Sequence, residues 1–498
     1  MAAPVPDAFV AMTGITKRYA GVTALDGVDF RVAAGEAVCL AGENGSGKST
    51  LIKILAGVEP QTDGEIRIGP TRHDRLTPRV SAAAGIMVIF QDFSLFPNLT
   101  VAENIGFATQ LSQHRRFYNA RDARTLARSV LDRIGVDIPV DARVETLPVA
   151  HKQLVAIARA LASEARLIIM DEPTTALTER EVRSLLGIIR RLKEDGVAVV
   201  FVSHKLAEVL EVSEKVVVLR NGRKVAEGPA SDFDAASLTR HMTGRDVPEV
   251  PPSALPGTPE TLMRVQGLNK SGAFRDVTFD IRKGEVLGIT GLLGSGRTSL
   301  AKALFGLVIP DTGSILLEGG SVPLGDPIAA AAAGIGYVPE DRLTEGLFLT
   351  RSIVHNVAIG RLDDHTRKGL LDMRSLVGEA ETWLRRLRVK APDTAAPVQS
   401  LSGGNQQRVV LSRWLARAPR VLVLNGPSVG VDVGSKAEIH DIIRDLAAQG
   451  LGVVVISDDL PELLATCHRI LVMRAGSIVD EIASGAITES DLAHKLAS

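Results

Sequence analysis

Gly42-Glu43-Asn44-Gly45-Ser46-Gly47-Lys48-Ser49-Thr50 lies between an apolar run, residues 37–41, and a helical pattern that begins at Leu51. This order of strand, glycine-rich loop and helix is the context that a phosphate-binding P-loop requires. Glycines let successive backbone N–H groups turn toward an anion, and the helix N-terminus contributes the positive end of its dipole. We predict that Lys48 reaches the β- and γ-phosphates of a nucleotide and that the Ser49 hydroxyl binds Mg²⁺. The other loop residues predicted to contact the nucleotide are Gly42, Asn44, Gly45, Ser46, Gly47 and Thr50.

The overall composition limits the possible classes of protein. With 498 residues, the chain is long enough for two or more domains, each with its own core. Its 57 basic and 58 acidic residues nearly balance, which argues against a nucleic-acid-binding protein, because such proteins usually carry a basic excess. Cys39 and Cys467 are too few for a disulfide framework or a four-ligand zinc site. We expect no signal peptide, and no apolar run approaches the ~20 residues that span a bilayer, so a role at a membrane would require partners.

The second half of the chain repeats the first. A Pro-rich stretch, residues 248–260, is typical of a linker, and residues 291–299 then match the P-loop at an offset of 249 (291 − 42). Later stretches match at an offset of 254 (401 − 147). Fixed offsets over long stretches indicate duplicated domains, here 1–247 and 261–498. Each half alternates short apolar strands with helices, and a helical insert follows the first strands, so the predicted fold class is α/β with two tandem P-loop domains.

Polar residues follow the predicted strands of the first half at their carboxyl ends. Asp171 and Glu172 come directly after the apolar run 167–170. Adjacent buried acids are costly, so we favour a chemical role over a purely structural one, with Asp171 holding Mg²⁺ and Glu172 polarising the attacking water. His204 ends a further strand; a lone histidine is more often a packed or surface residue, but this position makes it a candidate for contacting the γ-phosphate. Gln91 follows another apolar run and is a weaker candidate for bridging metal, water and a moving helical domain.

The most specific stretch of the chain is Leu401-Ser402-Gly403-Gly404-Asn405-Gln406-Gln407. A serine and two glycines open a predicted helix there and form a second anion-binding surface. A domain that has its own P-loop needs no second phosphate site, unless that site serves a neighbour. Together with the P-loop, Gln91, Asp171-Glu172 and His204 in this order, the chain resembles the ATP-binding subunits of ABC transporters, and residues 401–407 resemble their signature motif. The resemblance covers both halves.

The chain is most similar to the double-length ATPase subunits of bacterial simple-sugar importers of the ribose, galactose and xylose type. The stretches that point to this branch are Gly296-Arg297-Thr298, Val338-Pro339-Glu340-Asp341-Arg342 and Gly430-Val431-Asp432-Val433-Gly434. The resemblance implies two tandem ABC nucleotide-binding domains, each with an α/β core and an α-helical subdomain. It also implies that ATP lies between the P-loop (Walker A) of one domain and the signature of the other, with Tyr19 stacked on the adenine. An exposed aromatic on a strand remains the alternative for Tyr19. The signature residues expected at the nucleotide are Ser402, Gly403, Gly404 and Gln406, and those expected at Mg²⁺ are Ser49, Gln91 and Asp171.

This resemblance further implies an ATPase that powers the uptake of a simple sugar or a related small polar solute. The implied partners are two membrane permease subunits and an extracytoplasmic sugar-binding protein, with no nucleic acid, and the implied location is peripheral, on the cytoplasmic face of the inner (plasma) membrane. The alternative is a translation factor of the ABC superfamily acting on the ribosome. Such factors resemble one another in having a long charged linker and two intact catalytic halves. This chain has a short Pro-rich linker and one altered half. A DNA-repair ATPase would need a coiled-coil or zinc insert, and a regulator without turnover fits poorly with the intact acids and histidine.

The two halves differ at the residues that carry chemistry. In the second half, Arg297, Glu340 and Asp458 replace the P-loop lysine, the glutamine and the histidine of the first. The first two replacements are usual in the second half of this family. Asn425-Gly426 is a departure from the Asp-Glu that the family commonly keeps, and it leaves neither a carboxylate to polarise water nor a charge to hold Mg²⁺.

The signature of the first half is also altered. Pro148 stands where the second half has the serine hydroxyl, and Ala150 stands where it has a glycine. When the parts are paired across the halves, the intact Walker A of the first meets the intact signature of the second. The altered P-loop of the second half meets the altered signature. We therefore predict one hydrolytic site per chain, with the other site at most holding nucleotide.

Overall fold

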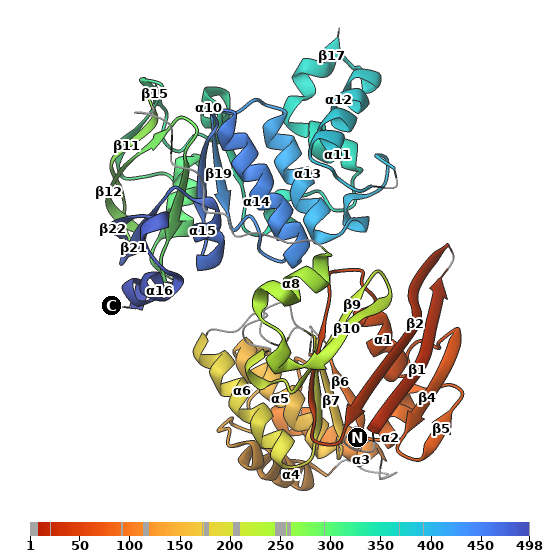
Figure 1. Cartoon of the computed structure of the whole chain (residues 1–498). Coiled ribbons are helices and arrows are strands. Elements are labelled where there is room, and N and C mark those ends of the chain that lie inside the picture. The colour runs from red at the N-terminus through yellow and green to blue at the C-terminus, as the bar shows by residue number, and fades with distance from the viewer. Residues whose placement is uncertain are drawn as a thin grey trace. The chain divides into compact units, whose positions relative to one another are not determined.

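The chain divides into two compact units, Met1–Val247 and Pro248–Ser498 (Figure 1). The computed structural model describes residues 8–19, 21–90, 93–112, 119–171, 173, 179–202, 210–244, 255, 260–292, 294–367, 369–391 and 393–497. Each unit has its own clusters of buried apolar side chains. Each therefore has the hydrophobic cores expected of an independent domain.

The first unit is built around a six-stranded sheet that carries the P-loop. In spatial order its strands are β10 (Arg223–Pro229), β9 (Lys215–Arg220), β3 (Ala37–Ala41), β8 (Ala198–Val202), β7 (Leu167–Asp171) and β6 (Ile86–Ile89). β10 is antiparallel to β9, and the other neighbours pair in parallel. Every residue of β3 and β8 is buried, as expected for apolar parallel strands that are covered on both faces.

A second, antiparallel sheet completes the α/β core of this unit. Its strands in spatial order are β2 (Val22–Ala33), β1 (Ala8–Tyr19), β4 (Asp63–Ile68) and β5 (Thr71–His73). The helix that follows the P-loop, α1 (Lys48–Leu55), buries Leu51 and Leu55 in a cluster that draws on strands of both sheets. The P-loop is therefore anchored at each of its ends in the core.

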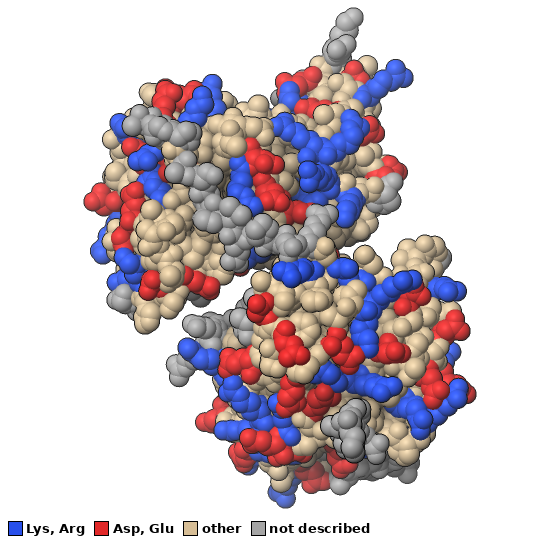
Figure 2. Space-filling view, viewed as in Figure 1, with Lys and Arg blue, Asp and Glu red and all other residues tan. Residues whose placement is uncertain are grey.

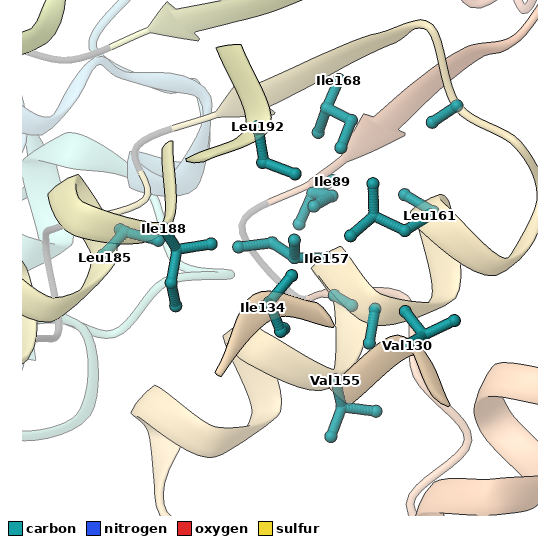
Figure 3. Close-up of a cluster of buried hydrophobic side chains, with 14 of the residues drawn as sticks. Ile89, Val130, Ile134, Val155, Ile157, Leu161, Ile168, Leu185, Ile188 and Leu192 are labelled. Carbon is teal, nitrogen blue, oxygen red and sulfur yellow. The ribbon is translucent and has the colours of Figure 1, made fainter. Parts of the chain in front are cut away.

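Helices accompany the two sheets in the described part of the first unit. They are α2 (Pro78–Ala83), α3 (Val101–Ser112), α4 (Ala120–Ile134), α5 (Val149–Ala162), α6 (Glu179–Glu194) and α8 (Ala235–Thr243), with short 3₁₀ turns η1 (Val144–Thr146) and η2 (Ala230–Asp232). α4 buries one stripe of small and apolar residues at helical spacing, and its ends are capped by the Asn119 side chain and by Gly135 with φ 69°. In Figure 3, Ile134 of α4, Ile157 of α5 and Ile188 of α6 lie in one cluster with residues of β6 and β7.

The second unit repeats this architecture. Its six-stranded sheet has the order β16 (Ile335–Val338), β19 (Val421–Asn425), β20 (Gly452–Ile456), β13 (Val286–Thr290), β21 (Arg469–Arg474) and β22 (Ser477–Ala483). Its antiparallel sheet has the order β12 (Phe274–Arg282), β11 (Thr261–Lys270), β14 (Thr312–Leu317) and β15 (Gly320–Val322). These orders match those of the first unit strand for strand, so the duplication inferred from the fixed offsets is present in the fold.

The helices of the second unit follow the same plan. They are α9 (Arg297–Leu304), α10 (Pro327–Ala333), α11 (Ile353–Ala358), α12 (Met373–Arg386), α13 (Gly403–Leu415), α14 (Val433–Ala448), α15 (Leu460–Thr466) and α16 (Glu489–Ala497). Shorter elements are the π-helical turn η3 (Arg342–Gly346), the 3₁₀ turns η4 (Ile359–His365), η5 (Val398–Ser400) and η6 (Ser484–Ala486), and the hairpin β17 (Thr366–Arg367) and β18 (Leu370–Leu371).

The distribution of surface charge and the composition of the helices both bear on function. Acidic and basic side chains are interspersed on the visible face of each unit, in keeping with a formal net charge of −1 (Figure 2). Within the described ranges, no helix combines the length and the apolar composition that crossing a membrane requires.

Candidate functional site

The P-loop of the first unit connects the end of β3 to the start of α1, as the sequence predicts. Gly47, immediately before the helix, has φ 107°, a conformation that residues with a side chain rarely adopt. A Cβ atom there would lie 2.6 Å from Leu25 Cδ2 and 2.7 Å from the carbonyl oxygen of Ala24. Gly42 has φ 150°, and a Cβ atom on it would overlap the carbonyl oxygen of Leu219. These glycines let the loop lie tightly against its own unit.

The side chains of the loop suit an anionic ligand. Lys48 Nζ donates to the carbonyl oxygens of Gly42 (2.6 Å) and Glu43 (2.8 Å), so its ammonium group lies across the loop. Ser46 Oγ is buried and has no hydrogen-bond partner within the described part of the chain. A buried hydroxyl without a hydrogen-bond partner is costly, so Ser46 is suited to a ligand that supplies one. The ammonium group and the open space at Gly45 match what a bound phosphate requires. The loop therefore fits the predicted nucleotide phosphates.

Strand register brings Asp171, one of the two predicted acidic residues, to the edge of the sheet where the P-loop lies. Leu40 of β3 is paired with Val202 of β8, and Val202 is paired with Asp171 of β7. Parallel strands lie ~4.8 Å apart, so Asp171 is two strands, or roughly 10 Å, from the strand that enters the P-loop. Ligands of open α/β sheets bind at this carboxyl edge. The half-buried Asp171 carboxylate is thus on the correct edge to serve a metal bound to phosphate.

The oxygen groups at this edge fit Mg²⁺. The Ser49 side chain is exposed on the first turn of α1, and Asp171 ends β7. Among the described residues there is no cluster of three or more His, Cys, Asp or Glu side chains that could enclose a metal by themselves. Mg²⁺ commonly takes only one or two protein oxygens and completes its coordination with water and substrate phosphate. The Ser49 hydroxyl and the Asp171 carboxylate would be two such protein oxygen ligands.

Tyr19 lies at the end of β1 and is 42% exposed. Lys17 Nζ lies 4.9 Å from the centre of its ring and is itself held by Glu59 Oε2 (3.1 Å) and the carbonyl oxygen of Pro60 (2.7 Å). Lys17 is paired with Leu25, the residue whose side chain borders Gly47 of the P-loop. Tyr19 is two residues further along the strand, which places an exposed aromatic ring on the hairpin beside the loop.

The signature stretch begins α13 in the second unit. Ser402 is the N-cap residue; it is exposed, and its Oγ accepts a hydrogen bond of 2.9 Å from Asn405 Nδ2. A Cβ atom on Gly404 would overlap the side chain of Ser435. The Gln406 side chain points inward and donates to the carbonyl oxygen of Leu401 (3.1 Å). The glycine and the buried glutamine thus shape a helix start that presents backbone N–H groups behind an exposed serine.

The corresponding helix of the first unit, α5, begins one residue after Pro148. Pro148 has φ −56° and ψ 155°, close to the values of Ser402 (φ −63°, ψ 157°). The backbone path is therefore the same, but proline has neither a hydroxyl nor a backbone N–H. Val149 and Ala150 add side chains where the second unit has glycines.

The P-loop of the second unit has a different charge arrangement. Arg297 Nη1 donates to the carbonyl oxygen of Gly291 (2.5 Å), and Nη2 forms an ion pair of 3.0 Å with Asp458 Oδ2. Asn425 Nδ2 lies 3.5 Å from Glu340 Oε2. Gly426 has φ 61°, and a Cβ atom on it would lie 2.8 Å from Val429 Cγ2. The substituted side chains of this site therefore contact one another in two pairs, Arg297 with Asp458 and Asn425 with Glu340.

Residues 25–175 and 274–429 match the ABC transporter family. The chain belongs to this family. Ribose import ATP-binding protein RbsA 1 of Rubrobacter xylanophilus is 44% identical over 96% of this chain and 96% of its own length. Ribose import ATP-binding protein RbsA 2 of Streptomyces avermitilis is 40% identical over 98% of this chain and 96% of its own length, and ribose import ATP-binding protein RbsA of Rhodococcus jostii is 39% identical over 99% and 98%. The predicted fold class, two tandem ABC nucleotide-binding domains, is confirmed.

The ABC motifs of the first unit are only partly within the described residues. The Walker A loop and Asp171 lie at one edge of the sheet. Gln91, Glu172 and His204 lie outside the described residues and stay predictions. Of these, Glu172 and His204 belong to the segments that directly follow β7 and β8.

One feature of the second ABC domain was not evident from the sequence. Arg297 and Asp458 were identified as two separate substitutions, whereas in the structure they form an ion pair across 161 positions of the chain. The sequence signal that could have predicted this ion pair is a paired substitution. Lys48 and His204 of the first half correspond to Arg297 and Asp458 of the second, which carry opposite charges. The Asp458 carboxylate therefore forms an ion pair with the arginine that stands in the second unit where the first unit has Lys48.

Proposed function

We propose that this chain is the ATP-hydrolysing subunit of an ABC importer for a simple sugar or a related small polar solute. The observation that carries the proposal is the Walker A loop of the first unit, which has its lysine and glycines intact at the sheet edge that also holds Asp171. The relatives of nearly full length quoted above are named as ribose import proteins, which favours transport of a sugar. They lend no support to the alternative of a translation factor.

In this function the Lys48 ammonium group exchanges the carbonyl oxygens of Gly42 and Glu43 for phosphate oxygens. Ser49 and Asp171, with Gln91, are the residues proposed to hold Mg²⁺, which when bound neutralises charge on the phosphates. The following residue, Glu172, is proposed to polarise the attacking water. His204 is proposed to contact the γ-phosphate, and Tyr19 the adenine.

We further propose that ATP on the first unit is completed by the signature residues Ser402, Gly403 and Gly404, while Gln406 supports them from within. The basis is the complementary pattern of losses. The second unit keeps an intact signature and has an altered P-loop, whereas the first has an intact P-loop and Pro148 in place of the signature serine. One hydrolytic site per chain follows from this pairing.

The proposed organisation is two domains, 1–247 and 261–498, joined by the linker 248–260. An import ATPase acts with membrane permease subunits and a solute-binding protein. We propose two permease subunits, an extracytoplasmic sugar-binding protein, and a peripheral position on the cytoplasmic face of the inner membrane.

Two measurements test the function. The purified chain should release phosphate from Mg-ATP, and a strain without the chain should lose uptake of labelled ribose or another simple sugar. Uptake should return with the unchanged chain and not with Glu172→Gln. Phosphate release combined with normal uptake of all simple sugars in the deletion strain would overturn the assignment to sugar import.

A further inference from the structure

Arg342 joins three segments of the second unit. It begins the turn η3, shortly after β16, and its side chain is half-buried. Nη1 donates to the carbonyl oxygen of Val429 (2.6 Å), and Nη2 to that of Gly430 (2.9 Å). Nε lies 3.4 Å from Gln406 Oε1. One guanidinium group thus connects the segment after β16, the loop after β19 and the helix that begins at the signature.

The guanidinium group also lies directly against the signature glycine. A Cβ atom on Gly403 would be 2.7 Å from Arg342 Nη2 and 2.7 Å from the carbonyl oxygen of Gly430. Gly430 has φ 66°, so its carbonyl is presented by a left-handed turn. Arg342 and Gly430 therefore form the surface on which the first turn of α13 rests.

The first unit provides an internal comparison. At the offset of 249, the position of Arg342 is occupied by Phe93. That unit forms the same sheet order and an equivalent helix, α5, without this arginine. The fold alone does not require the arginine. The unit that lacks it is also the unit whose signature has Pro148 and Ala150, so arginine and intact signature occur together.

We propose that Arg342 is a positioning residue that holds Ser402–Gly404 in the orientation needed to complete the ATP site of the first unit. This inference rests on the proposed function. Arg342 acts through the Val429 and Gly430 carbonyl groups and Gln406. Donors that are already aimed at a developing charge are effective because they need no reorganisation during the reaction. Arg342 belongs to the second unit, whose own catalytic residues are altered. It thereby serves the ATP site of the first unit, to which the second unit contributes its signature.

The test uses the full-length chain with Arg342→Met, Arg342→Lys and a control, Arg444→Met. Arg444 also donates to a backbone carbonyl, that of Ala465 (3.2 Å), and pairs with Asp441, but it lies on α14 away from these contacts. For Arg342→Met we expect kcat for Mg-ATP to fall at least tenfold, while the dissociation constant for ADP stays within twofold, because ADP has no γ-phosphate for the signature to contact. Arg342→Lys should be intermediate, since one ammonium group cannot reproduce the planar fork.

A second readout does not depend on turnover. Backbone amides of residues 402–406 should exchange with deuterium faster in Arg342→Met than in the unchanged chain, and at the normal rate in Arg444→Met. If Arg342→Met does not fold, Arg342→Lys carries the same comparisons. A kcat within twofold of the unchanged chain, unchanged exchange at 402–406, or equal kcat losses in Arg342→Met and Arg444→Met would each overturn the proposal. An unchanged chain that releases no phosphate would count against the proposed function, and the exchange measurement would still decide the role of Arg342.

Discussion

The substitution Gly403→Ala tests the importance of the signature with a single added methyl group. A Cβ atom at this position would lie 2.7 Å from the Gly430 carbonyl oxygen and 2.7 Å from Arg342 Nη2. A relaxed carbon–oxygen contact is about 3.3 Å or longer, so the first turn of α13 must move by roughly 0.5 Å. The arginine side chain can move aside, but the Gly430 carbonyl is part of a left-handed turn. The shift therefore falls on the signature residues.

The size of the effect follows from this displacement. Overpacking of this kind costs about 1–3 kcal/mol of unfolding free energy, and the better helix propensity of alanine returns about 0.5–1 kcal/mol. The net loss of unfolding free energy should therefore be about 0–2.5 kcal/mol. Misplacement of catalytic groups by 1 Å costs up to about a hundredfold in rate, so a tenfold or greater fall in kcat is expected at saturating Mg-ATP.

Phosphate release and thermal unfolding of the full-length chain measure the two effects. The matched control is Val149→Ala, at the corresponding position of the first unit, where the side chain is 40% exposed. Exposed substitutions of this kind usually change stability by no more than about 0.5 kcal/mol, and kcat should stay within twofold. An unchanged kcat in Gly403→Ala, or an equal loss in Val149→Ala, would mean that hydrolysis does not depend on the position of the first turn of α13.

Four further predictions concern the active site and the core. Glu172→Gln should lower steady-state ATP hydrolysis by roughly a hundredfold or more and leave ATP binding intact, as measured by phosphate release and nucleotide titration; retention of about half the rate would mean that the second site also hydrolyses. Ser402→Arg should abolish phosphate release, whereas Pro148→Arg should cost far less, and equal losses would contradict a single hydrolytic site. Burial raises the pKa of the Cys39 and Cys467 thiols to about 12, so native protein should resist alkylation at pH 8 and react fully only when unfolded. Because the unfolded thiols ionise near their ordinary pKa of 9.0, the unfolding free energy should fall as pH rises above that value, which a denaturant titration series from pH 8 to 10 would detect.

The features that the sequence determined are local in the chain. The P-loop is one continuous stretch, and its glycines adopt the positive φ angles that the motif requires because each depends on one residue and its neighbours. Apolar strands of four or five residues and helices with one apolar stripe gave the α/β class, and fixed offsets gave the duplication. The altered residues of the second half were visible individually for the same reason.

Contacts between residues that are distant in the chain depend on tertiary structure. The Arg297–Asp458 ion pair joins positions 161 apart, and Arg342 reaches carbonyl groups 87 and 88 positions away. Gln406, predicted at the nucleotide, directs its amide into its own unit. No local pattern encodes such contacts, because they depend on how strands and loops distant in the chain are brought side by side by the packing of the core. Sequence motifs therefore located the chemistry, while the fold determined which side chains neutralise, support or position one another.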